Sequence, residues 1–250
     1  MARKILLTLV SWWAWTVFLT VSALNIVSGI AAQLLAMPFD PHRKTALWVN
    51  RLIWGRLLFL LELSFPIQRR GVEHVGPGPY VMVCNHSSVL DIPSCLGLPV
   101  PLRVVGKTSL FRVPFMGWYM SFCRQIPLDS SSEHSVELFM RRCRDTLDAG
   151  ISVLIFPEGT RSADAKLQRF HRGAFRLAKD TNTPVLPVAV LGTHRALAKG
   201  RLPLVQAFSQ IRLLATPPLD PASHSTARKL SNRAHEAIYT ALAELRQEQA

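Results

Sequence analysis

The sequence predicts an α/β protein, in which a mixed, mostly parallel sheet flanked by helices is preceded by an N-terminal membrane-embedded helical segment. The membrane segment is indicated by residues 5–39, which carry no charged side chain. The sheet is indicated by apolar runs at 81–84 and 151–156, which have the length of buried strands, with a helical pattern at 132–149 between them. We expect three parts: a membrane helix or helical hairpin at 1–38, an interfacial helix and linker at 39–66, and an α/β domain at 67–250.

The composition limits the classes of partner expected for this chain. The 250 residues are 49% hydrophobic, and 29 Lys and Arg against 16 Asp and Glu give a formal charge of +13. This charge favours an anionic partner, and no RNA-recognition or helix-turn-helix pattern accompanies it, so we expect membrane lipid and no nucleic acid. Four cysteines lack metal-ligand spacing, which predicts reduced thiols, no metal and a cytosol-facing domain; they are Cys84, Cys95, Cys123 and Cys143.

The uncharged segment at 5–39 is too long for a simple membrane span. As one straight helix it would measure about 50 Å, against a hydrocarbon core of about 30 Å, so it must tilt, overhang or fold back. Asn25 and the pair Ser28 and Gly29 lie in its middle and favour a shallow helical hairpin over one spanning helix. A cleaved signal peptide is not expected, because the apolar run exceeds a normal signal core and no small-x-small site closes it.

Residues 46–66 continue the apolar character with three charged interruptions. Arg51, Arg56 and Glu62 suit an interfacial helix whose basic side chains meet lipid head groups. An ordinary core helix of the domain is the alternative.

The strand at 81–84 ends in a polar turn that carries the first candidate site. His86 follows the carboxyl end of this strand, where open α/β sheets bind ligands. Ser87 or Ser88 is positioned to cap the next helix, and Asp91 in its first turn reaches back to the imidazole. A carboxylate there would orient His86 as a general base. The alternative is that Asp91 only binds free N–H groups of the helix, as in a capping box.

The second candidate site directly follows the strand at 151–156. Gly159 would let the backbone approach a ligand closely, Thr160 offers a hydroxyl, and Arg161 presents a planar fork that suits phosphate. The alternative is a solvated ion pair between Glu158 and Arg161.

The remaining elements complete an alternating pattern. The helix at 132–149 is expected to stop at Gly150, and a strand at 185–190 is expected near a sheet edge or at a bulge because it contains Pro187. Further strands are expected at 102–106, 125–128 and 205–215, and a final amphipathic helix at 223–249.

These motifs together resemble the glycerolipid acyltransferase family, specifically the 1-acylglycerol-3-phosphate acyltransferases of bacteria and organelles. The resemblance covers about residues 38–192. It is carried by Asn85-His86-x-x-x-x-Asp91, Lys107 with Leu110-x-x-x-Pro114-x-x-Gly117, the Phe156-Pro-Glu-Gly-Thr-Arg-Ser162 run, Phe170-x-x-Gly173-Ala174, and Val185-Leu-Pro-Val188.

The resemblance implies transfer of a fatty acyl group from an acyl thioester to the free hydroxyl of a lysophospholipid, foremost 1-acylglycerol-3-phosphate to give phosphatidic acid. Acyl carrier protein or coenzyme A would carry the acyl group as co-substrate, with no bound cofactor. His86 would be the base and Asp91 its orienting partner, while Glu158, Gly159 and Arg161 would bind the acceptor. The expected location is a bacterial inner membrane, with the active domain facing the cytoplasm.

One departure from the family concerns the acceptor. The family has a hydrophobic block that ends in Asp-Arg, whereas here Asp129 is followed by Ser130. Either Arg124 or another basic residue compensates, or the acceptor is a different lysolipid, such as a lyso-aminolipid.

Two other classes of function compete. One is a non-catalytic lipid-binding membrane protein, which has no need of the His86 and Asp91 pair. The other is a hydrolase using Cys84 or Ser87, which the missing G-x-S-x-G elbow disfavours.

Overall fold

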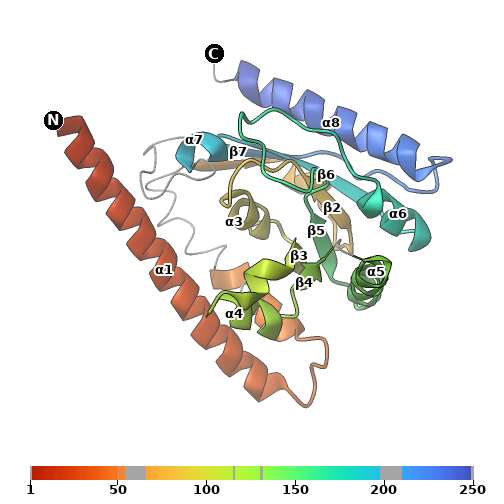
Figure 1. Ribbon diagram of the computed structural model, residues 1–250, viewed down its shortest axis with the longest axis horizontal. Coiled ribbons are helices and arrows are strands. Elements are labelled where there is room, and N and C mark those ends of the chain that lie inside the picture. Colours follow the sequence, from red (N-terminus) through yellow and green to blue (C-terminus); the bar gives the residue numbers. More distant parts are fainter. Residues whose placement is uncertain are drawn as a thin grey trace.

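The computed structural model contains one seven-stranded sheet among the residues that it describes, in the order β1-β7-β6-β2-β5-β3-β4 (Figure 1). The described residues are 2–49, 51–53, 66–114, 116–129, 132–197 and 210–248. The strands are β1 (Ile67–Arg70), β2 (Val81–Cys84), β3 (Leu102–Lys107), β4 (Ile126–Leu128), β5 (Ser152–Ile155), β6 (Val185–Leu191) and β7 (Ile211–Ala215). Neighbouring strands run parallel except β6 and β7, which confirms the predicted mixed, mostly parallel sheet.

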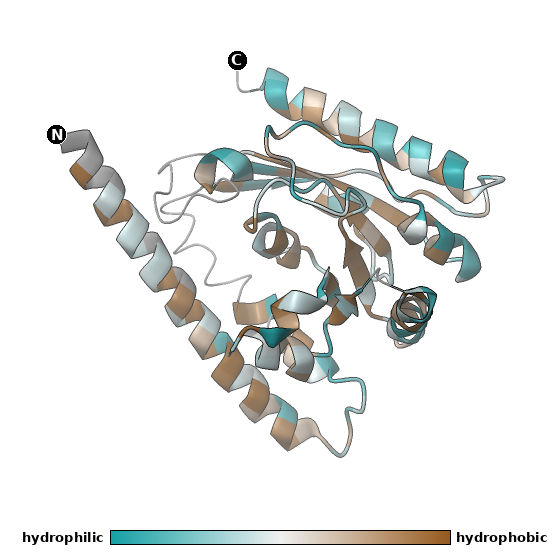
Figure 2. Cartoon of the chain, in the orientation of Figure 1, coloured by the Kyte–Doolittle hydropathy of each residue, from teal (hydrophilic) through white to brown (hydrophobic). Residues whose placement is uncertain are grey.

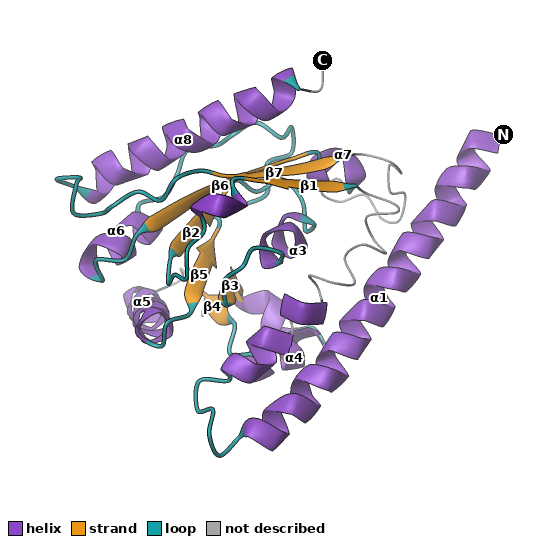
Figure 3. Ribbon diagram, turned by 180° about the vertical axis from the view of Figure 1, so that it is seen from behind, coloured by secondary structure: helices purple, strands orange, loops and turns teal. Residues whose placement is uncertain are grey.

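Helices cover both faces of the sheet (Figure 3). The helices are α1 (Ala2–Ala36), α3 (Asp91–Leu96), α4 (Met116–Phe122), α5 (Glu133–Asp148), α6 (Gly173–Asp180), α7 (Thr193–Ala196) and α8 (Ala227–Gln247), with 3-10 turns η1 (Val72–His74) and η2 (Thr108–Arg112). On β2, Val81 and Val83 pack with residues of α5, α6 and α8, whereas Met82 and Cys84 pack on the opposite face with residues of α3 and α7. Because both faces are buried, β2 is a continuous apolar run instead of an alternating one.

Local capping chemistry sets the ends of the predicted crossover helix. Ser132 accepts the backbone N–H of Ser135 at the start of α5, and Gly150 after its end adopts a φ of 72°. A left-handed backbone at that position stops a helix and favours glycine. The predicted helix at 132–149 is therefore confirmed.

The expected edge position of the strand with Pro187 is wrong. This strand, β6, is central and lies between β7 and β2. Pairing of β6 with β7 is regular from Val188 and Ala215, and the carbonyl of Pro187 still accepts the N–H of Thr216 at 3.0 Å, but Pro187 has no N–H to donate in return, so the ladder ends there. The expected strand at 205–215 is present as β7, and its residues before 210 lie outside the described part.

The hairpin favoured for the amino terminus is also wrong, because α1 is one continuous helix. Ser28 does not break it, since its hydroxyl donates to the carbonyl of Leu24 one turn earlier, a bond that helices tolerate. Gly29 packs against Tyr119 of α4, where a Cβ would lie 3.5 Å from the phenol oxygen. Close packing on the domain thus holds the helix straight through the residues expected to break it.

The faces of α1 are reversed relative to a helix of a soluble protein. Its buried side is a stripe with four-residue spacing that includes Val17, Val21, Asn25 and Gln33. Its outward side is apolar, and the exposed residues include Leu9, Trp12, Leu19, Val27 and Leu35 (Figure 2). Within the described chain, Thr8–Ala36 is the one stretch long and apolar enough to cross a membrane, by length and composition alone.

The segment after α1 turns back onto the domain. Gln33 joins the two by accepting the N–H of Ala46 and donating to the carbonyl of Asp40. Residues 44–49 and 51–53 are helical, and Ala46 and Leu47 are buried in a small cluster with Cys123 and Ile151. Residues 54–65 of the predicted interfacial helix lie outside the described part, and the predicted boundaries of the three parts stay predictions.

Candidate active site

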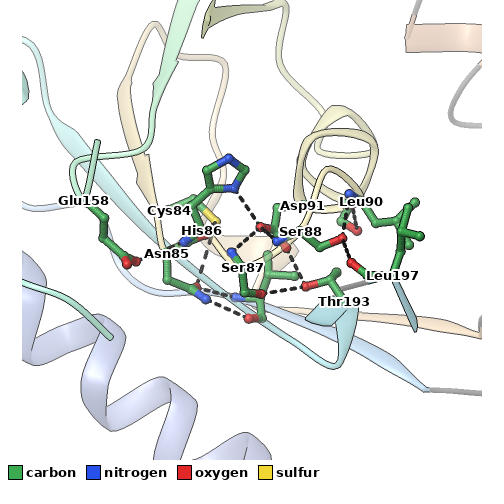
Figure 4. A network of polar contacts seen from close by, with 12 residues as sticks. Cys84, Asn85, His86, Ser87, Ser88, Leu90, Asp91, Glu158, Thr193 and Leu197 are labelled. Atoms are coloured by element: carbon green, nitrogen blue, oxygen red, sulfur yellow. Dashed lines mark hydrogen bonds and ion pairs between the residues drawn. The ribbon is translucent and has the colours of Figure 1, made fainter. Parts of the chain in front are cut away.

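The imidazole of His86 and the carboxylate of Asp91 form the centre of the site. Nδ1 of His86 lies 2.8 Å from Oδ2 of Asp91 (Figure 4). The same oxygen accepts the backbone N–H groups of Ser87 at 2.7 Å and Ser88 at 2.8 Å. Since an ionised carboxylate oxygen can only accept hydrogen bonds, this contact assigns the proton to Nδ1 and leaves Nε2 as the basic nitrogen.

Asp91 therefore unites the two roles weighed for it from the sequence. It binds N–H groups before the helix, as in the capping alternative, and it also orients the imidazole. The predicted cap at Ser87 or Ser88 is wrong, because α3 begins at Asp91 itself after Leu90, with no side-chain cap. The hydroxyl of Ser88 instead donates to the carbonyl of Leu197.

A threonine just after β6 completes the binding of Asp91. Thr193 is the first residue of α7 and donates its hydroxyl to Oδ1 of Asp91 at 2.5 Å. Asn85 ties the turn to the same strand, because its amide donates to the carbonyl of Val190 at 2.9 Å and accepts the N–H of Val190 at 2.8 Å. The turn is thus fixed from the carboxyl end of β6.

The loop after β5 holds His86 from the other side. Oε1 of Glu158 accepts the backbone N–H of His86 at 3.0 Å, and the N–H of Ser162 donates to the carbonyl of His86 at 2.7 Å. The ring of Phe156 stacks on the imidazole, with ring centroids 4.0 Å apart. Together with Asp91 these contacts fix both the position of His86 and the plane of its ring.

Glu158 is a buried carboxyl group with an altered proton affinity. Burial raises its pKa to about 7, and the nearby charge of Asp91 acts in the same direction, while backbone N–H groups of His86 and Gln168 lower it. The alternative ion pair with Arg161 is absent from the described chain, because Glu158 binds the backbone of His86 instead. The sequence therefore identified the residue but not its contact.

Nε2 of His86 is the open end of this network. The side chain is 16% exposed, and Nε2 has no hydrogen-bond partner in the described part of the chain. Figure 4 shows this nitrogen on the side of the ring turned away from Asp91. An oriented imidazole with one free basic nitrogen can take a proton from a bound hydroxyl.

The other predicted residues lie at the same edge of the sheet, with one exception. Lys107 ends β3 and is exposed, while Thr160 and Arg161 follow β5 in the same loop as Glu158. Arg161 is half-buried and makes no hydrogen bond or ion pair within the described residues. Because β2, β3 and β5 are parallel, their carboxyl ends bring these side chains to one side of the sheet.

Gly159 is needed for its backbone conformation. Its φ is 70°, in the left-handed region, and an added Cβ would lie 3.3 Å from the ring of His171. Its predicted close approach to a ligand stays a prediction.

Arg124 is the exception. It precedes β4, which is parallel to β3, so it lies at the amino ends of the strands, across the sheet from His86. The prediction that it compensates for Ser130 at this site is therefore not supported by the fold. Ser130 itself lies outside the described residues.

The candidate nucleophiles of a hydrolase do not face His86. Cys84 is fully buried, burial raises the pKa of its thiol well above the usual range, and its sulfur lies 3.2 Å from the carbonyl of Asn85. Ser87 is buried and shares a hydrogen bond with Thr193 at 3.1 Å. All four cysteines are free and buried, and the described residues contain no group of three or more His, Cys, Asp or Glu placed to hold a metal.

A family model described as Acyltransferase matches residues 66–191, which is half of the chain. The chain belongs to the acyltransferase family. The acyltransferase is 30% identical over 235 residues to a 1-acyl-sn-glycerol-3-phosphate acyltransferase of Chlamydomonas reinhardtii, covering 93% of this chain and 69% of that protein. It is 33% identical over 187 residues to the chloroplastic 1-acyl-sn-glycerol-3-phosphate acyltransferase LPAT1 of Arabidopsis thaliana, with 70% and 52% covered, so it spans about half the length of that relative.

A solved structure is similar to the acyltransferase along nearly its whole length. This is the crystal structure of the 1-acyl-sn-glycerophosphate acyltransferase PlsC from Thermotoga maritima. The TM-score is 0.75 at 25% sequence identity, and the match covers 98% of this chain and 97% of the other. The similarity includes the N-terminal segment as well as the sheet.

Three residues of the acyltransferase site were not singled out from the sequence: Asn85, Phe156 and Thr193. Asn85 directly precedes His86 in a recognised motif, and this position was a signal for its role, whereas Phe156 belongs to the other motif and its stacking on the imidazole had no local signal. Thr193 had no such signal, because it lies 102 residues after Asp91 and follows an unremarkable strand end.

Proposed function

We propose that the protein is a membrane-associated O-acyltransferase that moves a fatty acyl group from a thioester to the free hydroxyl of 1-acylglycerol-3-phosphate, giving phosphatidic acid. The observation that carries this proposal is the imidazole of His86, oriented by Asp91 at 2.8 Å with Nε2 unoccupied at the carboxyl edge of the sheet. The names of the relatives and of the solved structure support the same acceptor.

The reaction follows from this geometry. Nε2 takes the proton of the acceptor hydroxyl while the hydroxyl oxygen attacks the carbonyl carbon of the thioester. The C–S bond then breaks, and the leaving thiolate takes the proton back from the imidazolium, so that an ester and a free thiol are formed. The carboxylate of Asp91 stabilises the transient imidazolium, and no side chain of the enzyme is acylated.

Arg161 and Lys107 are the proposed partners of the acceptor phosphate. Both cations are at the edge of the sheet that carries His86, and neither is paired with a carboxylate within the described chain. A guanidinium fork matches two phosphate oxygens, and a phosphate held there is only a few bonds from the reacting hydroxyl. Thr160 offers a hydroxyl to the same ligand. Glu158 acts on His86 through the backbone, so its proposed role is positioning.

Membrane association is part of the proposal. The outward face of α1 is apolar while its polar residues Asn25 and Gln33 face the domain, an arrangement that suits contact with lipid better than contact with water. The charge of +13 adds attraction to anionic lipid. The proposed place is a bacterial inner membrane with the domain on the cytoplasmic side. One relative is bacterial, from Pseudomonas aeruginosa, and others are chloroplastic.

The donor is proposed to be acyl coenzyme A or acyl carrier protein, with no bound cofactor. A different lysolipid, such as a lyso-aminolipid, remains the alternative acceptor because Ser130 stands where the family has Arg. A non-catalytic lipid-binding protein would have no use for an oriented imidazole.

The test is an acyl-transfer assay with radiolabelled thioester on each carrier and a panel of lysolipids with and without a phosphate monoester. We expect phosphatidic acid as the main product, and loss of about 10²- to 10⁴-fold in turnover for His86→Ala, the range for removal of a general base. His134→Ala, an exposed histidine at the start of α5, is the matched control. Equal turnover in the two variants would exclude His86 as the general base. Preference for a lysolipid without a phosphate monoester would exclude 1-acylglycerol-3-phosphate as the acceptor.

A further inference from the structure

Arg103 is a charged residue inside an otherwise apolar strand. It is the second residue of β3 and is 5% exposed. Nη1 donates to the hydroxyl of Thr146 at 3.0 Å and Nη2 to the carbonyl of His42 at 2.5 Å, whereas Nε has no partner. No ion pair joins Arg103 to any carboxylate of the described chain. A cation buried in this way is costly unless an anion accompanies it.

The surroundings of Arg103 add positive charge. Burial and the nearby charges of Arg124 and Arg43 together lower the pKa of its guanidinium to about 10, although the nearby charge of Asp40 acts in the opposite direction. Arg103, Arg124 and Arg142 line one open pocket of about 790 Å³. Asp145 and Asp148 also line it, but both are exposed and neither forms an ion pair with the arginines.

The backbone around the pocket is strained. Arg124 has a φ of 53° and Arg43 a φ of 55°, and residues other than glycine rarely adopt such values. Strain of this kind persists where the surrounding structure imposes it, and it gathers at binding sites.

The pocket is separate from the candidate active site. It lies at the amino ends of β3 and β4, whereas His86 and Arg161 follow the carboxyl ends of β2 and β5. It is also close along the chain to the end of α1, where His42 lines the pocket just after the exposed side chain of Phe39.

We infer that this pocket, lined by Arg103, Arg124 and Arg142, binds a phosphate group, supplied by a phospholipid head group or by a soluble phosphate. Guanidinium forks bind phosphate oxygens two at a time, and the exposed side chains of Arg124 and Arg142 offer such forks, while the buried Arg103 adds its charge to the same lining. The bound anion supplies a partner for the charge of Arg103, with which no carboxylate of the described chain forms an ion pair.

The test uses the full chain in nonionic detergent micelles, with the unfolding midpoint followed by tryptophan fluorescence. Every protein in this test also carries Arg161→Ala, so that the phosphate site proposed for the acceptor does not contribute to the shift. The two probes are inorganic phosphate, at constant ionic strength with chloride, and phosphatidylglycerol mixed into the micelle, with phosphatidylcholine as the neutral lipid. At about ten times the dissociation constant, a ligand of the folded state should raise the midpoint by about 3–6 °C.

Arg124→Ala is the diagnostic variant, because Arg124 is exposed and its removal leaves the buried contacts of Arg103 intact. Arg228→Ala, an exposed arginine of α8, removes the same charge elsewhere. We expect the shift to persist with Arg228→Ala and to fall below half with Arg124→Ala. A shift with inorganic phosphate identifies a soluble ligand, and a shift with phosphatidylglycerol alone identifies a lipid head group. No shift with either probe, or equal shifts in the two variants, overturns the inference.

Discussion

Glu158→Gln should change how the stability of the protein depends on pH. Glu158 is 4% exposed, and its carboxyl group has a pKa of about 7, against 4.5 for the unfolded chain. The folded protein therefore holds this proton more tightly than the unfolded chain, so the contribution of Glu158 to stability is present in acid and is lost as the pH rises through about 7. Glutamine keeps an oxygen for the N–H of His86 but does not titrate.

The magnitude follows from the two pKa values. Between pH 5 and pH 8, the wild type should lose about 2.5 kcal/mol of unfolding free energy relative to Glu158→Gln. For a chain of this size, that loss moves the difference between their unfolding midpoints by about 5–10 °C. Any fixed cost of burying the amide is the same at both pH values and cancels.

The assay is thermal unfolding in detergent micelles at pH 5 and pH 8, followed by tryptophan fluorescence. Glu137→Gln, an exposed residue of α5, is the matched control and should follow the wild type at both pH values. A difference in midpoint between wild type and Glu158→Gln that does not change with pH would refute the raised pKa and the reasoning from burial.

Three other predictions concern the site and the membrane helix. Arg161→Lys should raise the acceptor KM or lower kcat/KM at least tenfold with little change in thioester KM, because a single ammonium cannot reproduce the fork; wild-type kinetics with every phosphorylated acceptor would exclude the phosphate role. Thr193→Val should lower the unfolding free energy by about 1–3 kcal/mol, because Oδ1 of the buried Asp91 loses its hydrogen-bond donor. Thr193→Ser keeps the hydroxyl and should retain most of the wild-type stability, and chemical unfolding of both variants measures the difference. Deletion of residues 1–38 should weaken attachment to vesicles yet leave salt-sensitive binding to anionic lipid in flotation assays, and a deleted protein that stays unbound at low salt contradicts this.

The sequence by itself determined the elements whose signals are local. The apolar runs at 81–84 and 151–156 predicted β2 and β5, because strands buried on both faces contain apolar residues without alternation. The helix α5 was predicted from its period and from Gly150, and the spacing of His86 and Asp91 predicted their contact. The apolar pattern of a buried strand and the cap of a helix each depend on a few neighbouring residues, so a short stretch of sequence is enough to predict them.

Only the tertiary structure decided which distant residues meet. Thr193 reaches Asp91 because β6 pairs with β2, and Glu158 binds the backbone of His86 because β5 is the other neighbour of β2. The continuity of α1 depends on the packing of Gly29 against α4, which overrides its weak local preference for a helix. Strand order and helix docking are set by the total burial of the whole chain, so no local pattern of residues specifies them.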